Sequence, residues 1–425
     1  MKESVLHYVW QHKLFAAVNL QLSSGQPIEI IDVGKLNTDS GPDFFNAKIK
    51  IDQIVWAGNI EIHTRASDWY RHRHETDRAY DQIILHVVQQ ADVQVYDVSG
   101  RAIPQLELSF PSSIEEEYEN LMQNVRWVAC EDYLADIHPF VLSSWQERMV
   151  IERLMVKSDE IQRLLQQFTW HWEEVFYVRL AEAFGTSVNG HAFRMLAMSL
   201  PTNVWLKHAD YLPDMEALFI GQSGLLHERL EDDYAVQLYQ NYLHLKHKYR
   251  LTSIDASLWK MLRLRPANFP LRRIAELAAL LHHRPRIFAQ LTLLSTYKEM
   301  SDLLSSETSG YWKSRFNWGD DSGIIFRHPG KEFLQSLIIN AVVPVLFSFA
   351  KSCGDKELEE KALSLQMQIP PENNLIIRQW AERGIQFQHA ADTQAWLHLK
   401  KHYCDLKKCL RCSIGYVILS NKNKK

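Results

Sequence analysis

Cysteine is scarce in this chain, which has five cysteines at uneven spacing among 425 residues. Small secreted domains that depend on disulfides carry a denser set, so the sequence excludes a disulfide framework and favours a reducing compartment. The N-terminal segment MKESVLHYVWQHKLF mixes charged residues and histidines in an amphipathic pattern. It lacks the uninterrupted apolar run of a signal peptide. We therefore expect a cytoplasmic protein.

A long apolar run and a strong charge of one sign are lacking too. The most apolar segment, residues 337–350, contains Asn340 and Pro344. It is shorter than the about 20 residues that cross a bilayer, so it predicts a buried helix and no membrane partner. The net charge of -4 argues against wholesale coating of nucleic acid, but it leaves room for a local basic face.

The composition, 46% hydrophobic and 23% charged, is that of a globular protein long enough for two or three domains. Residues 1–112 begin with a predicted helix over about 3–16 and continue with short Ile- and Val-rich runs between Gly, Asp and Ser, which are typical of strands. Residues 113–385 are predicted to be helical, with apolar residues at three- and four-residue steps. Residues 386–425 are predicted to form a C-terminal helix with a cysteine knuckle and a basic tail. The expected fold class is α+β: an α/β domain with a mixed sheet, then a large, mostly α-helical region.

The most reactive stretch lies in residues 41–88. Asp43 follows a Gly41-Pro42 turn, and Glu61 and His63 alternate with isoleucines on a predicted strand, so their side chains share one sheet face. If the two strands are neighbours, Asp43 and Glu61 approach each other at one sheet end. Two carboxylates there can bind Mg²⁺ or Mn²⁺, and such a metal polarises a phosphoryl oxygen and supplies hydroxide. His63 could orient or deprotonate the water, or ligate the metal.

A predicted helix over residues 67–82 extends this cluster. His74, Asp77 and Tyr80 are spaced i, i+3, i+6 and would lie along one side of it. His72 is expected on the helix surface, and His86, inside an apolar run, on a sheet face or in the core. A Gly-Pro-Asp turn is common without any function, because Pro fixes φ and Asp satisfies turn amides. A purely structural role for the cluster therefore stays open.

The layout of residues 1–112 resembles the PD-(D/E)XK nuclease superfamily, which has an acidic helix residue, a Pro-Asp strand, a Glu-x-Lys strand, and then a helix and a further strand. The resemblance implies a restriction-endonuclease-like fold and metal-dependent cleavage of DNA or RNA. Glu3 would match the acidic helix residue, Asp43 the Pro-Asp position and Glu61 the third motif. His63 stands where the superfamily usually has Lys, and imidazole loses the fixed positive charge near pH 7.

Two further resemblances concern the following helix and the whole chain. RecB-like members of the superfamily carry Gln-x3-Tyr on that helix, so the resemblance implies a comparable role for the polar face of His74, Asp77 and Tyr80. Along the whole chain, GPDF, GNIEIH, SDW, ILHVV, SLP, IGQSGLL, RPANFP and YCDLKKCLRCSIG resemble a bacterial family, the domain of unknown function numbered 2851. These matches run from residue 3 to about 418, and that family implies no particular activity.

Three of the five cysteines lie near the C-terminus. A Cys409-x2-Cys412 hairpin supplies two thiolates, and Cys404, with His402 or a distant residue, can complete four ligands. Zinc and an iron–sulfur cluster both fit this pattern. Some RecB-like nucleases carry three C-terminal cysteines and one remote upstream cysteine, a resemblance that makes Cys130 a candidate. Buried cysteines packed as small hydrophobic residues are the alternative.

Two groups of basic residues are candidate contacts to the phosphates of nucleic acid. With them, Trp259 and Phe269 could stack on bases. Helix packing with exposed arginines is the alternative. The groups are Arg263, Arg265, Arg272 and Arg273, and, beside the cysteines, Lys407, Lys408 and Arg411.

The sequence thus predicts a metal-dependent nuclease whose partner is DNA or RNA. The alternative is a nuclease-like nucleic-acid-binding or scaffold protein that has lost catalysis through the change of Lys to His. A third interpretation makes the histidine-rich site a metal centre for another hydrolysis. Protein partners are not indicated.

Overall fold

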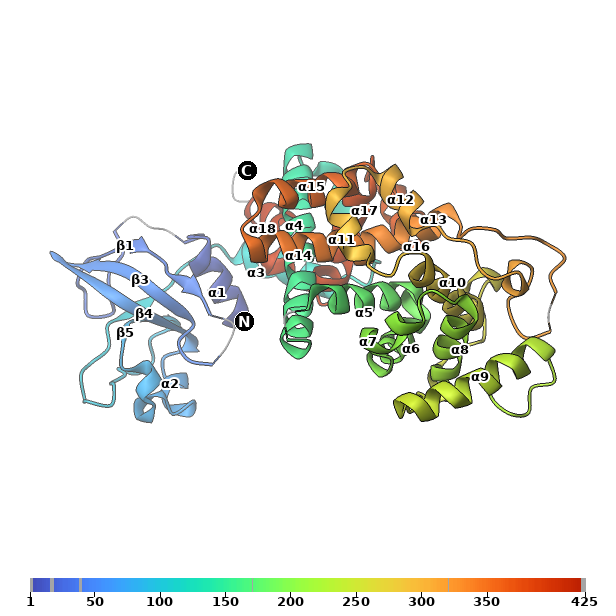
Figure 1. Ribbon diagram of the computed structural model, residues 1–425. Helices are drawn as coiled ribbons and strands as arrows, with labels where there is room; N and C mark the ends of the chain where they lie inside the picture. The colour runs from blue at the N-terminus through green and yellow to red at the C-terminus, as the bar shows by residue number, and fades with distance from the viewer. Residues whose placement is uncertain (1–2, 16–18, 38–39, 170, 320, 422–425) are drawn as a thin grey trace. The chain divides into compact units, whose positions relative to one another are not determined.

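The computed structural model describes residues 3–15, 19–37, 40–169, 171–319 and 321–421 (Figure 1). These divide into two compact units, the first made of Met1–Trp145 with Leu399–Lys425 and the second of Gln146–His398. The fold is a mixed sheet followed by a mostly helical region, as the α+β class predicts. The units differ from the predicted boundaries at 112 and 385, because the chain after the sheet and the C-terminal segment share contacts within the first unit.

The sheet of the first unit is mixed, as predicted. Its order is β1-β3-β4-β5-β6, with β2 paired to β3. The pairs β1–β3 and β3–β4 are antiparallel, whereas β4–β5 and β5–β6 are parallel. Residues 93–98, predicted as a strand, form only an isolated bridge between Tyr96 and Ala102. The strands are β1 (Ile28–Asp32), β2 (Lys35–Leu36), β3 (Phe44–Ile51), β4 (Ile54–Arg65), β5 (Ile83–Gln90) and β6 (Gln105–Glu107).

Helix α1 (Glu3–Gln11) packs on β4. It is shorter than the predicted helix over 3–16, whose last residue lies outside the described part of the chain. It buries one apolar stripe, and the Trp10 indole donates to the carbonyl of Val33 at 3.1 Å. On the β5 side, Gly58 lets the strands approach, since a Cβ there would lie 2.4 Å from Cγ2 of Ile84. Residues 60–63 of β4, whose side chains alternate between the two faces of the sheet, are all buried.

The predicted helix over 67–82 is wrong, because the chain forms three short pieces. These are α2 (Asp68–Arg71) and two 3-10 turns, His74–Thr76 and Arg78–Tyr80. Arg73 between them has φ of 62°, a left-handed conformation that an α-helix cannot continue through. His74 and Tyr80 consequently turn inward and stack with ring centroids 3.8 Å apart. Asp77 is exposed and accepts the amide of Ala79 at 2.9 Å.

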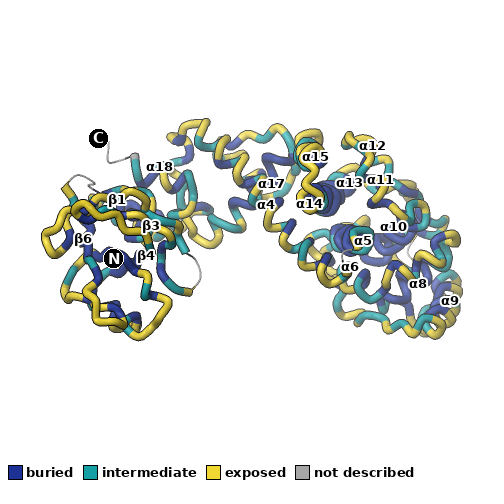
Figure 2. Tube along the Cα trace, turned by 60° about the vertical axis from the view of Figure 1, so that its left-hand side comes forward, coloured by how far each residue is buried: buried dark blue, intermediate teal, exposed yellow. Residues whose placement is uncertain are grey.

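Most of the remaining helices lie in the second unit. Buried residues run through α5, α8 and α10 (Figure 2). The first unit also holds α3 (Ser112–Gln123), α18 (Ser413–Asn421) and the 3-10 turn Glu131–Asp136. The others are α4 (Pro139–Gln167), α5 (Trp172–Phe184), α6 (Thr186–Ser199), α7 (Thr202–Trp205), α8 (Leu212–Gln222), α9 (Asp233–Tyr249), α10 (Pro270–His283), α11 (Ile287–Leu293), α12 (Tyr297–Leu304), α13 (Lys331–Leu337), α14 (Val343–Cys353), α15 (Lys356–Met367), α16 (Leu375–Glu382) and α17 (Ala390–Leu399).

Among the described residues, one helix is long and apolar enough to cross a membrane by length and composition alone. It is Lys331–Cys353, formed by α13, a π turn and α14, and 78% of its most apolar window is buried inside the structure. Its polar groups meet partners on α4: Arg153 donates to Oδ1 of Asn340 at 3.2 Å, and Ser158 to the Ser348 hydroxyl at 3.0 Å. These features are typical of a core helix.

Candidate functional site

The two carboxylates predicted to meet do lie together in the first unit. The antiparallel pairing of β3 and β4 sets Phe44 opposite Ile60, so Asp43, which precedes β3, lies beside Glu61. The Asp43 amide donates to Oε2 of Glu61 at 3.1 Å, and the Ile62 amide donates to Oδ2 of Asp43 at 2.9 Å. The Gly-Pro-Asp turn and the alternation along β4 therefore place both side chains at the same end of the sheet.

Helix α1 adds a carboxylate and an imidazole to this end. Nε2 of His7 lies 3.8 Å from Oε1 of Glu3 and 3.2 Å from Oδ2 of Asp43. One donor atom from each of Glu3, His7 and Asp43 lies within 4.8 Å of the others. The structure thus brings Glu3 to the cluster, and it adds His7, which the sequence reasoning missed. The spacing of Glu3 and His7 on one helix face was the available signal.

Four histidines lie next to the carboxylates. Nδ1 of His63 is 2.9 Å from Nε2 of His86, and Nε2 of His63 is 3.1 Å from Nδ1 of His72. Donor atoms of His63, His72 and His74 lie within 4.8 Å of one another. Nε2 of His74 is 3.2 Å from Oε1 of Glu61, which joins this group to the carboxylates. His72 is exposed, as expected, but it contacts the site, and so does buried His86.

Burial gives the cluster an unusual protonation state. Burial, and then the charge of Asp43, raise the pKa of Glu61 to about 9. Burial, and then the neighbouring histidines, lower the pKa of His63 to about 2, and burial lowers that of His86 to about 3. Without a cation, Glu61 therefore keeps its proton and both imidazoles stay neutral near pH 7. A bound cation would reverse the effect on Glu61, because it favours the ionised carboxylate and releases the proton.

Two buried imidazole nitrogens lie against the carboxylates. Nε2 of His7 and Nε2 of His74 are both buried. His7 pairs with the Asp43 side chain, whereas Nε2 of His74 has no hydrogen-bond partner among the described residues. Each nitrogen lies 3.2 Å from a carboxylate oxygen, of Asp43 and Glu61 respectively. A buried polar atom without a partner costs about 1–3 kcal/mol. Nitrogen and oxygen atoms that converge in this way are the arrangement of ligands around a cation, and this mixed set suits Mn²⁺, Zn²⁺ or Fe²⁺ as well as Mg²⁺.

The polar face predicted on the helix after β4 is only partly present. Tyr80 is buried against His74. Its pKa is raised to about 12 by burial and then by Glu61, so it keeps its proton. Asp77 is exposed and caps the turn Arg78–Tyr80. The prediction that it shares a face with His74 and Tyr80 is wrong, because the chain does not form one continuous helix there.

Half of the first basic group is buried. Nε of Arg272 lies 2.8 Å from Oε1 of Glu276, and Nη1 of Arg273 lies 2.5 Å from Oε2 of the same residue. Both arginines are at most 5% exposed, so the prediction that they face phosphates is wrong. Trp259 is buried too, and its indole donates to the carbonyl of Ser223 at 2.8 Å. These residues stabilise the helical unit.

The other basic residues are exposed. Arg263 and Arg265 lie before α10 in the second unit, and Lys407, Lys408 and Arg411 lie between the C-terminal cysteines in the first. The ammonium of Lys407 donates to the Met122 carbonyl at 2.6 Å, and contact of these five residues with phosphates stays a prediction.

The C-terminal cysteines gather around a cavity. Cys404, Cys409 and Cys412 line it together with Cys130, and His402 is not among its lining residues. Of the two sources left open for a fourth ligand, the structure places the distant Cys130 beside the three C-terminal cysteines, and metal binding stays a prediction.

Comparison with known proteins finds one family. A family model described as Protein of unknown function (DUF2851) matches residues 3–375. Neither a curated protein nor a solved structure matches the chain. The matched range includes the cluster around Asp43 and Glu61 and ends before the C-terminal cysteines, earlier than the expected end near residue 418.

Proposed function

We propose that this chain, which belongs to the DUF2851 family, is a metal-dependent hydrolase that cleaves phosphodiester bonds in DNA or RNA. One observation carries the proposal. The carboxylates of Glu3, Asp43 and Glu61 converge with His7 and His74, whose Nε2 atoms each lie 3.2 Å from a carboxylate oxygen.

Each part of the cluster has a role in this proposal. Glu3, His7 and Asp43 would hold one divalent cation, with Glu61 beside it. When bound, such a cation polarises a phosphoryl oxygen and lowers the pKa of a water molecule. His63 lies between buried His86 and exposed His72, with nitrogen–nitrogen distances of 2.9 and 3.1 Å. As a neutral imidazole, His63 would orient a water molecule at the site rather than take up its proton.

The PD-(D/E)XK resemblance supports a nucleic-acid substrate. The acidic helix residue, the Pro-Asp position and the third-motif Glu of that superfamily correspond to Glu3, Asp43 and Glu61, which lie in one cluster here. We propose that residues 1–112 have this nuclease-like fold on the strength of that match and of the mixed sheet.

A second candidate function rests on His63. It takes the place of the superfamily's lysine, and it is 1% exposed with a pKa lowered to about 2 by burial and then by the neighbouring histidines. The site therefore lacks the fixed positive charge that lysine provides. This observation favours a nuclease-like nucleic-acid-binding or scaffold protein without catalysis.

Cleavage assays separate the two candidates. The full chain with Mn²⁺ or Mg²⁺ should cut end-labelled single-stranded DNA, double-stranded DNA or RNA, and EDTA should stop the reaction. Asp43→Ala should lower the rate by at least about 100-fold, since loss of a residue that only supports a ligand already weakens a metal site by about 10–100-fold, and the activated water is lost with the metal. Glu29→Ala, which changes an exposed carboxylate on β1, is the matched control and should cut normally.

Each other outcome has a clear meaning. Unchanged cleavage by the Asp43 variant would refute the site. No cleavage by the wild-type chain, with retained binding of nucleic acid, would support the second candidate. Absence of both cleavage and binding would exclude both functions.

A further inference from the structure

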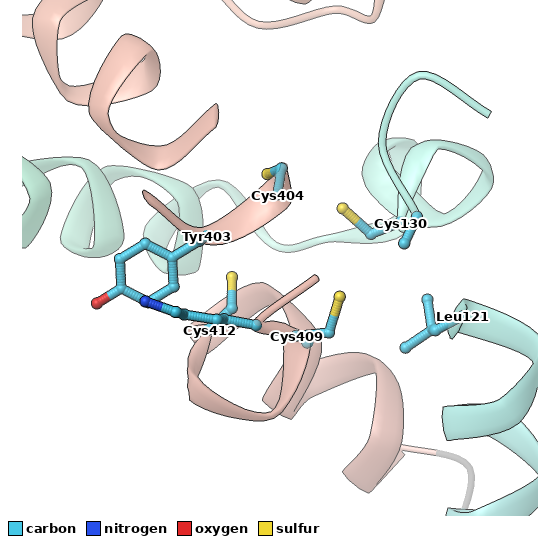
Figure 3. Close-up of a pocket in the computed structure, with 9 residues that line it drawn as sticks. Leu121, Cys130, Tyr403, Cys404, Cys409 and Cys412 are labelled. Carbon is cyan, nitrogen blue, oxygen red and sulfur yellow. The ribbon is translucent and has the colours of Figure 1, made fainter. Parts of the chain in front are cut away.

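Cysteines far apart in the sequence meet in the first unit. Cys130 precedes the 3-10 turn Glu131–Asp136, and Cys404 ends a π turn. Cys409 begins the 3-10 turn Cys409–Arg411, and Cys412 follows it. All four line a cavity of about 20 Å³, and none is in a disulfide. Figure 3 shows the four sulfur atoms around one space, one from the segment before α4 and three from the C-terminal segment. Four of the five cysteines of the chain thus gather at one place.

The hairpin that carries three of them is tightly folded by its own backbone. The Lys408 amide donates to the Tyr403 carbonyl at 2.9 Å, and the Cys412 amide donates to the Cys409 carbonyl at 3.2 Å. Gly415 is required there, because a Cβ would lie 2.1 Å from the Cys409 oxygen. The cysteines are therefore held in place by local geometry, which is what a ligand hairpin needs.

Backbone N–H groups favour the thiolate of one of the four cysteines. Cys412 directly precedes α18; burial raises the pKa of its thiol, and the backbone N–H groups of Gly415 and Ile414 at the start of that helix oppose the rise. Hydrogen bonds from such groups to sulfur stabilise a thiolate and are among the interactions that tune metal-bound sulfur.

The four thiols raise one another's pKa values by electrostatic interaction. Burial, and then Cys130, Cys412 and Cys409, raise the pKa of Cys404. Burial, and then Cys412 and Cys409, raise the pKa of Cys130 to about 12. Four thiolates this close are stable only with a cation between them, and a coordinating thiol is deprotonated by its metal.

We propose that Cys130, Cys404, Cys409 and Cys412 together hold a thiophilic metal centre. The centre fixes the C-terminal segment to the segment between α3 and α4, since Cys130 supplies the ligand from the latter. His402 is not a ligand in this arrangement. The site is independent of the carboxylate cluster and of the proposed hydrolase activity.

The spacing of the thiols bears on which metal is bound. Four thiolates at about 2.3 Å from a single zinc ion lie about 3.8 Å apart. Among the described residues, the groups of three donor atoms within 4.8 Å are the two in the carboxylate and histidine cluster, and the cysteines are not in them. An iron–sulfur cluster, also held by four cysteines, places several atoms between its ligands and fits these positions with less movement.

The test is metal analysis of the full chain purified without oxygen. Iron with acid-labile sulfide and visible absorbance, or one zinc per chain without it, would each support the centre and would identify the metal. Cys130→Ser should lose most of this metal. His402→Ala and Cys353→Ser, the latter an exposed cysteine outside the cavity, should retain it. Asp43→Ala should retain it too, which separates this site from the carboxylate cluster.

A second measurement covers the case in which Cys130→Ser does not fold. Stepwise modification of the wild-type chain with a mercurial should release the metal as the four cavity thiols react. A chain that is metal-free as purified and takes up neither Zn²⁺ nor reconstituted iron and sulfide would overturn the proposal. Full metal content in a folded Cys130→Ser chain would overturn it as well.

Discussion

Replacing Glu61 with Gln tests both the burial of this carboxyl and its role toward a cation. Glu61 is 5% exposed, and burial, followed by Asp43, raises its pKa from an ordinary 4.5 to about 9. The folded chain therefore keeps a proton that the unfolded chain releases. Because the folded pKa is raised, the associated stability is fully present below pH 4.5 and is lost as the pH rises towards about 9.

The size of the effect follows from how the free energy of unfolding changes with pH when folding takes up one proton. Each pH unit between the two pKa values lowers the free energy of unfolding by about 1.36 kcal/mol. From pH 5.5 to pH 7.5 the free energy of unfolding of the wild-type chain should therefore fall by about 2.7 kcal/mol because of Glu61. Glu61→Gln carries no titrating proton, so it should lack this loss and should gain relative to wild type by the same amount.

Hydrogen exchange of peptides from β4 and β5, in EDTA, measures the effect on the sheet itself. Local opening is the suitable observable because the chain has two compact units and need not unfold in one step. Glu29→Gln on β1 is the matched control, since it removes an exposed carboxylate from the same sheet. Equal pH dependence of the wild-type and Glu61→Gln chains would refute the reasoning about burial.

Adding Mn²⁺ to the same samples tests the second role of Glu61. At a concentration 100 times the dissociation constant, a cation that binds only the folded chain stabilises it by about 2.7 kcal/mol. The wild-type sheet should gain this protection, and the Gln variant should gain much less. Equal stabilisation of both chains would show that Glu61 does not contribute to cation binding.

Two further predictions concern the helical unit. Glu216 is fully buried, and burial raises its pKa to about 7, so its contribution to stability is complete below pH 4.5 and is lost as the pH rises through about 7. Between pH 5 and pH 8 the free energy of unfolding in urea should therefore rise for Glu216→Gln, relative to wild type, by on the order of 3 kcal/mol. The same change with pH in both chains would contradict this. Arg272→Ala should destabilise the helical unit by about 3–5 kcal/mol in thermal unfolding, because it removes a partner of buried Glu276. The control Arg265→Ala, at an exposed residue, should change stability by under about 0.5 kcal/mol. A small effect of Arg272→Ala would indicate that Arg272 faces solvent.

Local patterns in the sequence determined the parts of the site that depend on neighbouring residues. The alternation along residues 60–63 places Glu61 and His63 on one strand face, and the Gly-Pro-Asp turn sets Asp43 at the start of the adjacent strand. The apolar segment that ends at residue 350 lies in a helix that is mostly buried, as predicted, although that helix, Lys331–Cys353, is longer than the segment and is long enough to cross a membrane. These features follow from backbone periodicity, which is the same whatever packs on the element.

Tertiary structure decided everything that depends on which elements meet. His7, His72 and His86 join the cluster because α1, the turn after α2 and β5 all pack around β4. Cys130 reaches the C-terminal cysteines although 274 positions separate it from Cys404.

The charge pattern of a segment also did not predict which charged residues are buried. The sequence predicted Arg272 and Arg273 on a basic surface. In the structure both form ion pairs with Glu276, which lies about one helical turn away. The composition of a segment gives its charge, but the free energy of burying that charge depends on the neighbours that the fold supplies. The sequence by itself therefore determined which chemistry is available in this protein, and the tertiary structure decided which of those groups share a site and which are buried as structural pairs.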